Sequence, residues 1–85
     1  MKPSALLIQP AAPEPIYRQI TEQIKRFVAS GQLAPGDILP SVRDMAVELE
    51  VNPNTVMRSY EFLQNQGFIY NKRGLGLFVA PDGYD

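Results

Sequence analysis

Apolar residues recur at helical spacing along the first third of this 85-residue chain. Between Pro15 and Gly31 they fall at every third or fourth position, as Ile16, Ile20, Ile24, Phe27 and Val28. Glu14 and Pro15 are suited to the first turn of a helix, and Gly31 is suited to its end. The pattern therefore predicts a helix with one buried face and one charged face.

Two further helices are predicted on either side of a three-residue turn, 50–52. Ser41 is a suitable N-cap for the shorter helix, whose apolar positions are Val42, Met45, Ala46 and Leu49. Asn52 caps the longer helix, Pro53 is its first residue and Gly67 ends it. Helical spacing places Val56, Ser59, Tyr60 and Leu63 on its inward side.

A β-hairpin is predicted after the third helix, because runs 68–70 and 77–79 are β-rich and flank a loop with two glycines. Residues 1–13 contain three prolines and are predicted to form an extended arm, in which the apolar stretch 5–8 is able to pair as a strand. The fold class is therefore mainly α with a small β-hairpin (α+β).

Composition removes several kinds of function. The chain is 45% apolar and 20% charged, as in an ordinary globular domain, and it has no cysteine and no histidine. Disulfides, the usual zinc ligands and the usual neutral-pH general base are thus missing. Carboxylate pairs such as Asp44 and Glu48 have no nucleophile or metal ligand beside them, so we expect no enzyme, no cofactor and no metal site. The apolar run 5–8 is too short for a signal peptide or a membrane span, which predicts a cytoplasmic protein with no membrane partner.

The charge distribution changes the picture. A net charge of −1 and a pI near 5.3 argue against nucleic acid as a partner. Within residues 51–80, however, the basic side chains Arg58, Lys72 and Arg73 face a single acid, Glu61. This third of the chain is locally basic, which bears more directly on partners than the total charge does.

A short helix, a tight turn, a longer helix and a basic hairpin together form the order of a winged helix-turn-helix. In that architecture the second helix of the motif enters the major groove of DNA, and glycines allow the wing backbone to approach a groove closely. Small three-helix domains with a hairpin also serve as protein-docking modules, so this order alone leaves both functions open.

Several motifs follow one another along the chain. They are Pro15-Ile16-Tyr17, Gly31-Gln32-Leu33, Pro35-Gly36-Asp37, Leu39-Pro40-Ser41-Val42-Arg43, Val51-Asn52-Pro53-Asn54-Thr55-Val56, the Tyr60–Leu63–Gly67 pattern and Gly74-Leu75-Gly76-Leu77-Phe78-Val79. Over residues 13–80 they resemble the N-terminal winged-helix domain of the GntR family of bacterial transcription regulators. The motifs Ser-Val-Arg and Val-Asn-Pro-Asn-Thr-Val are most similar to the YtrA-like branch of that family, and the aminotransferase-fused branch shares the Ser-Val-Arg element.

The resemblance implies which residues contact DNA. It assigns them to Arg43 at the start of the second helix, to Pro53, Asn54 and Thr55 at the start of the third helix, and to Gly76 with Gly74 in the wing. The two capping residues, Ser41 and Asn52, are also candidates for DNA contact. Many members carry arginine directly after the Thr-Val pair, whereas this chain has Met57 there and Arg58 one place later.

Helical geometry extends this set independently of the family. At ~100° per residue, Asn54, Met57, Arg58 and Glu61 share a stripe opposite the inward side. Asparagine is able to pair with adenine, arginine with guanine and the methionine methyl with a thymine methyl. The alternative for Arg58 is a surface pair with Glu61 or Asn54.

The remaining basic and aromatic candidates lie at the wing and on the third helix. Lys72 and Arg73 are expected to contact phosphate, with a purely solubilising role as the alternative. Phe62 lies off the inward stripe and is expected to meet the N-terminal arm or a partner subunit.

The sequence therefore predicts a DNA-binding transcription regulator, a repressor that binds an inverted repeat as a dimer, with double-stranded DNA and a second copy as partners. The dimer is expected to be weak without DNA, and this segment is expected to bind no small-molecule effector. The predicted parts are an arm at 1–13, a winged helix-turn-helix domain at 14–80 and an acidic tail at 81–85 that would begin a C-terminal segment. A winged-helix protein-interaction module and the N-terminal piece of an aminotransferase-fused regulator are the alternatives.

Overall fold

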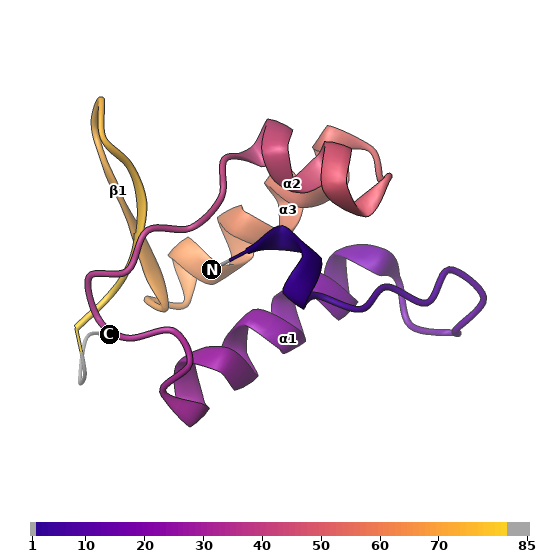
Figure 1. Cartoon of the computed structure of the whole chain (residues 1–85), viewed down its shortest axis with the longest axis horizontal. Helices are drawn as coiled ribbons and strands as arrows, with labels where there is room; N and C mark the ends of the chain where they lie inside the picture. Colours follow the sequence, from indigo (N-terminus) through magenta and orange to yellow (C-terminus); the bar gives the residue numbers. More distant parts are fainter. Residues whose placement is uncertain (1, 82–85) are drawn as a thin grey trace.

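The chain folds into three helices followed by a two-stranded hairpin (Figure 1). A computed structural model describes residues 2–81, so the predicted acidic tail lies outside the described residues except for Pro81. The elements are a short 3₁₀ helix η1 (Pro3–Ala5), α1 (Ile16–Ser30), α2 (Val42–Leu49), α3 (Pro53–Asn65), β1 (Ile69–Lys72) and β2 (Gly76–Val79). The predicted fold class, mainly α with a small hairpin, is confirmed.

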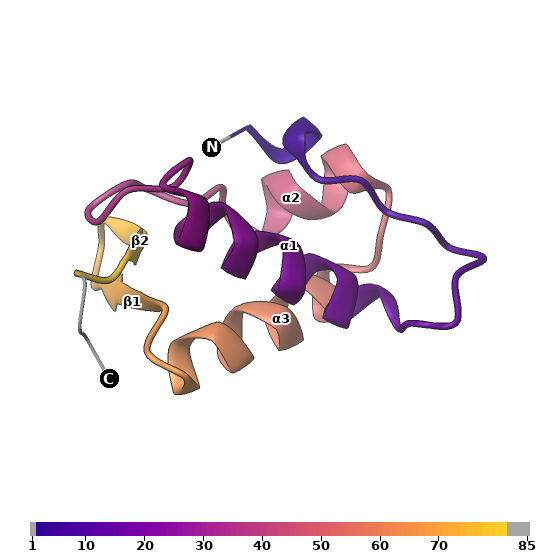
Figure 2. The ribbon, with the colours of Figure 1, turned by 90° about the horizontal axis from the view of Figure 1, so that it is seen from below.

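Helix α1 lies alongside α3 and supplies one wall of the core (Figure 2). Ile20 and Ile24 are fully buried, and the remaining residues of the predicted stripe pack against them partly exposed. The helix ends at Gly31, whose φ of +85° is the left-handed conformation that glycine adopts without strain. Pro15 precedes the helix as its N-cap with extended backbone, so the predicted opening at Glu14 and Pro15 is two residues early.

Capping side chains set the bounds of the helix-turn-helix. The Ser41 hydroxyl accepts a hydrogen bond from the Asp44 amide at 3.0 Å, and the Asn52 side-chain oxygen accepts one from the Asn54 amide at 2.8 Å. Each bond satisfies an amide that has no partner inside its own helix. Glu50, at the end of α2, has a φ of +56°, a left-handed conformation that turns the chain from one helix to the next.

The hairpin is joined by a third extended segment that the sequence did not predict. β1 and β2 pair antiparallel from Ile69 opposite Val79 to Lys72 opposite Gly76, so the predicted hairpin is confirmed. Ile38, between α1 and α2, pairs with Phe78, and the Leu39 amide donates to the Leu77 carbonyl at 2.8 Å. This pairing joins the β1–β2 hairpin, which is the wing, to the segment that leads into α2.

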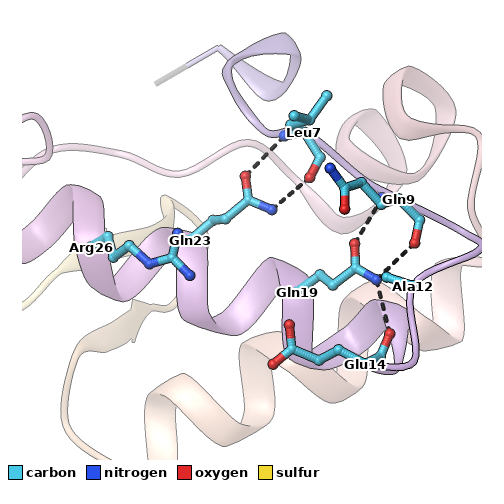
Figure 3. Close-up of a pocket in the computed structure, with 7 residues that line it drawn as sticks. All are labelled: Leu7, Gln9, Ala12, Glu14, Gln19, Gln23 and Arg26. Carbon is cyan, nitrogen blue, oxygen red and sulfur yellow. Dashed lines mark hydrogen bonds between the residues drawn. The ribbon is translucent and has the colours of Figure 1, made fainter.

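The N-terminal arm contacts α1 through two glutamine side chains (Figure 3). Gln23 accepts from the Leu7 amide at 2.9 Å and donates to the Leu7 carbonyl at 2.7 Å. Gln19 makes the same two bonds to Gln9, at 2.8 and 3.0 Å, and donates also to the Glu14 carbonyl. The apolar stretch does not pair as a strand: within residues 2–13 the backbone forms η1 and then runs irregularly. The side-chain amides of a helix take the place that a neighbouring strand would have.

None of the helices within residues 2–81 has the length and apolar character needed to span a membrane.

Candidate nucleic-acid interface

The inward side of α3 is the one that the sequence predicts. Val56, Ser59, Tyr60 and Leu63 are all buried. Ser59 shares a hydrogen bond of 2.8 Å with Thr21 of α1, and the Tyr60 hydroxyl donates to the Pro40 carbonyl at 2.8 Å. Burial raises the pKa of Tyr60 well above its ordinary value, so the hydroxyl keeps its proton and remains a donor. These bonds fix the rotation of α3 about its own axis.

The opposite side of α3 is therefore free to meet a partner. Asn54, Met57, Arg58 and Glu61 are exposed, with 47% of Met57 accessible. Thr55 is half-buried and lies beside this stripe rather than on it. The exposed stripe offers an amide, a thioether and a guanidinium, which are three chemistries able to distinguish base edges in a major groove.

Arg58 is held by an aromatic ring that no pattern in the sequence connects with it. Its guanidinium carbon lies 4.0 Å from the centre of the Tyr17 ring on α1. Among the described residues the one ion pair joins Lys25 to Glu22, so Arg58 pairs neither with Glu61 nor by hydrogen bond with Asn54. The alternative of a surface pair is wrong, and the cation–π stack takes its place.

The start of α2 presents an exposed guanidinium. Arg43 is the second residue of the helix and has no acidic partner within 4 Å among residues 2–81. It borders a hollow of about 490 Å³ between α2 and the arm, together with Pro3, Val47 and Glu48. Ser41 is also exposed, although its side-chain oxygen is already used as the cap of α2. Asn52 is committed to the cap of α3 in the same way.

The wing carries its charges at an exposed tip. Lys72 and Arg73 are both exposed, and the Lys72 ammonium lies 5.1 Å from the Phe78 ring centre and 5.8 Å from that of Tyr70. The two rings are 6.1 Å apart and form the platform beneath the lysine. Such a platform keeps the charge near the tip of the hairpin.

The two wing positions 74 and 76 require glycine for different structural reasons. Gly74 has a φ of +80° with open space around it, so a side chain there is disfavoured by backbone conformation alone. Gly76 has a φ of +124°, and an added Cβ would also lie 3.4 Å from Ile38 Cδ1. The structural requirement for glycine thus holds at both positions, whatever else they contact.

Two sets of the predicted site residues lie together, whereas Lys72, Arg73 and Gly74 belong to neither set. One hollow of about 490 Å³ brings Ser41 at the start of α2 together with Gly76 and Leu75 of the wing. Arg43 borders the neighbouring hollow, and both hollows share Ile38 and Leu39. The stripe of α3 forms the second set.

Tyr17 and Phe62 both lie where α1 faces α3. In the sequence Tyr17 stands out only as part of a motif, because no local pattern links it to an arginine 41 positions away. Phe62 lies against α1: the Lys25 ammonium lies 5.6 Å from its ring centre, and it borders a small hollow with Tyr17 and Glu22. The expected contact with the arm or a partner subunit stays a prediction.

Within residues 2–81 no three His, Cys, Asp or Glu side chains gather where they could hold a metal ion. The polar groups brought together here are donors and acceptors suited to a polyanion or to base edges.

Comparison with known proteins identifies the family to which the chain is similar. Residues 16–79 match the family described as bacterial regulatory proteins, gntR family. The HTH-type transcriptional repressor YtrA of Bacillus subtilis is 42% identical over 75 residues, which is 88% of this chain and 58% of that protein. The chain spans 55–58% of the length of the first curated relatives that it matches.

Solved structures with the same fold include a GntR-family transcription factor and a DNA-binding domain in complex with an operator. YtrA from Sulfolobus acidocaldarius, a GntR-family transcription factor, is 39% identical with a TM-score of 0.86, over 91% of this chain and 81% of that one. The AraR DNA-binding domain in complex with operator ORX1 is 27% identical with a TM-score of 0.76, over 88% of this chain and 93% of that one.

Proposed function

Because the chain belongs to the GntR family of bacterial regulatory proteins, we propose that it is a sequence-specific transcriptional repressor that binds an inverted-repeat operator as a dimer in the cytoplasm. The DNA-binding, winged-helix character is shared by the family's solved structures, including one in complex with an operator. The similarity to a protein named as a repressor supports the direction of regulation.

The exposed stripe of α3 carries the proposal. Its rotation is fixed by buried hydrogen bonds from Ser59 and Tyr60, so Asn54, Met57 and Arg58 are presented together on the outer side. A helix whose inner face is locked and whose outer face carries three base-reading chemistries is what major-groove recognition needs.

The other candidates contact the DNA backbone in this proposal. Arg43 and the capped start of α2, with Ser41, lie against phosphate, as do Asn52 and Thr55 at the start of α3. Lys72 and Arg73 bind phosphate beside a groove, where Gly74 and Gly76 allow the wing backbone to come close.

Selection of bound sites from random double-stranded DNA tests the function. We expect the 85-residue chain to enrich one short motif, arranged as an inverted repeat with half-sites about one helical turn apart. The same selection at raised salt separates specific from backbone binding, since backbone binding falls most steeply with salt.

Two results would contradict sequence-specific DNA binding, and a third would contradict the dimer. Equal recovery of all sequences would show a backbone binder without specificity, and no recovery at low salt would favour a protein-docking winged helix. Enrichment of a single asymmetric half-site would support sequence-specific DNA binding and contradict binding as a dimer.

A further inference from the structure

The guanidinium of Arg58 lies over an aromatic ring although the side chain is exposed. An arginine on a helix surface loses considerable rotamer freedom when it is fixed, so an ordered guanidinium needs a specific partner. Here the partner is Tyr17, with the guanidinium carbon 4.0 Å from the ring centre. This distance is shorter than those of the lysine–aromatic contacts in the structure, which run from 5.1 to 5.8 Å.

Two hydrogen bonds of hydroxyl groups connect the α1 backbone at Tyr17 with α3. The Thr21 hydroxyl donates to the Tyr17 carbonyl at 2.8 Å, so the 2.8 Å bond between Thr21 and Ser59 has the Ser59 hydroxyl as its donor. Ser59 is the residue next to Arg58. The buried bond between Ser59 and Thr21 therefore sets the register of α1 against α3 next to Arg58 and one turn from Tyr17, on the two helices that Figure 2 shows side by side.

A stacked guanidinium keeps its donors free. The ring covers one face of the planar group, while the N–H bonds lie in the plane and point away from the ring edge. Two parallel N–H bonds match a pair of acceptors, such as O6 and N7 of guanine or two phosphate oxygens. The stack thus orders the head group without consuming the donors that a DNA contact uses.

We propose that Tyr17 is a positioning residue for DNA recognition, which holds the guanidinium of Arg58 ready for a paired acceptor on the DNA. This inference rests on the proposed function, because it concerns how one of the proposed contacts is made. Tyr17 acts through Arg58 and needs no DNA contact of its own.

A double-mutant cycle on the selected operator tests the inference. Tyr17→Leu removes the ring and is expected to weaken binding about 2- to 5-fold, the range of an exposed cation–π contact. Tyr17→Phe keeps the ring and is expected to stay within about twofold of the parent chain. In the Arg58→Ala background, Tyr17→Leu is expected to cause no further loss.

Phe62→Leu is the matched control, since Phe62 also lies beneath a cation between α1 and α3, at 5.6 Å from Lys25. It is expected to leave operator affinity unchanged. Thermal unfolding of each variant checks the fold, and Tyr17→Met replaces the leucine variant if that variant is unfolded.

The outcomes separate this inference from the function on which it rests. An equal loss from Tyr17→Leu in both backgrounds, or a loss from Tyr17→Phe as large as that from leucine, would overturn the inference alone. No preferred operator for the parent chain would overturn the proposed function and the inference together. In the free chain, the Arg58 Hδ protons should be shifted upfield by the Tyr17 ring current, and normal shifts would overturn the stack itself.

Base preference and salt slope identify the acceptor. If Tyr17→Leu and Arg58→Ala relax preference at the same base pair, the acceptor is guanine. If instead both lower the salt slope and leave preference intact, it is phosphate. Either result supports the positioning role when the cycle is non-additive.

Discussion

Arg43 and Arg58 are both exposed, and they differ in what holds their head groups. Arg58 lies on α3 against the ring of Tyr17, whereas Arg43 lies on α2 with no acidic partner among the described residues. A pre-ordered arginine on a recognition helix is suited to a contact that depends on angle, such as a base edge. An unrestrained arginine on the preceding helix is suited to phosphate, which tolerates many approaches.

We expect the loss of each arginine to have a different effect on operator affinity and base preference. Arg58→Ala should cost about 1–3 kcal/mol on the preferred operator and relax preference at one base position. Arg43→Ala should weaken binding to preferred and altered operators alike. Binding measured over a panel of single-base operator variants checks both expectations. A changed base preference in Arg43→Ala, with none in Arg58→Ala, would mean that α3 does not read the groove.

One residue in the turn between α2 and α3 has a backbone conformation that is unfavourable in free energy. Glu50 has a φ of +56° without the freedom of glycine, and a left-handed L-residue costs roughly 1–2 kcal/mol. Its amide still bonds to carbonyls of α2, so the conformation is required by the turn. The side chain of Glu50 is exposed, and within residues 2–81 it makes no ion pair that would offset this cost.

Glu50→Gly should therefore stabilise the domain. We expect a gain of about 0.5–1 kcal/mol after the greater entropy of glycine in the unfolded chain is subtracted, or roughly 2–8 °C in Tm. Glu48→Gly, at an exposed and ordinary helical position of α2, is the control and should destabilise by about 1 kcal/mol. Equal losses for both variants would show that the left-handed residue is not strained.

The wing is an element whose charge is carried by its tip. The aromatic platform of Tyr70 and Phe78 supports Lys72, and Arg73 follows in the exposed loop. Because phosphate contacts release counterions from DNA, their number is read from the salt dependence of binding.

Replacing Lys72 and Arg73 by alanine should weaken binding to all sequences alike. The slope of log affinity against log salt should flatten by about 0.9 for each phosphate that the variant no longer neutralises. Lys25→Ala is the control, because this lysine pairs with Glu22 on α1. A slope that stays at the parent value would place the wing tip away from the phosphates.

The dimensions of the molecule suit paired binding. Its extents are 35 × 26 × 21 Å, and half-sites one turn apart on B-DNA are separated by about 34–36 Å. Two copies on successive turns of one DNA face fit side by side when a shorter axis of the molecule lies along the DNA. The most exposed apolar side chains are Leu7, Val47 and Leu75, which lie on the arm, α2 and the wing. Val47 and Leu75 border the two neighbouring hollows that share Ile38 and Leu39.

We expect the 85-residue chain to sediment as a monomer at micromolar concentration and to bind an operator with two chains per inverted repeat. Sedimentation with and without DNA measures both quantities. A stable micromolar dimer in free solution would contradict the first part, and it would turn attention to Leu7 and Phe62 as contact residues.

The helix bounds were predictable because caps are local. Ser41, Asn52 and Gly31 each act on residues a few positions away, and each predicted bound agrees with the structure to within one or two residues. Pairings between distant elements were not predictable. Ile38 beside Phe78 and Tyr17 beside Arg58 join positions about 40 apart, and no periodicity in the sequence specifies which partner a side chain will meet.

The attachment of the arm has a consequence for which substitutions the chain tolerates. Gln19 and Gln23 bind the amide and carbonyl of Gln9 and Leu7, which every residue except proline possesses, so nearly any side chain is compatible with this anchor at those two positions. Proline at either position would remove one donor and release one of the two bonds. An insertion between them would disturb both, because the spacing of two arm residues matches one turn of the helix that holds them. We therefore expect the chain to tolerate most side chains at these two arm positions and not to tolerate an insertion between them.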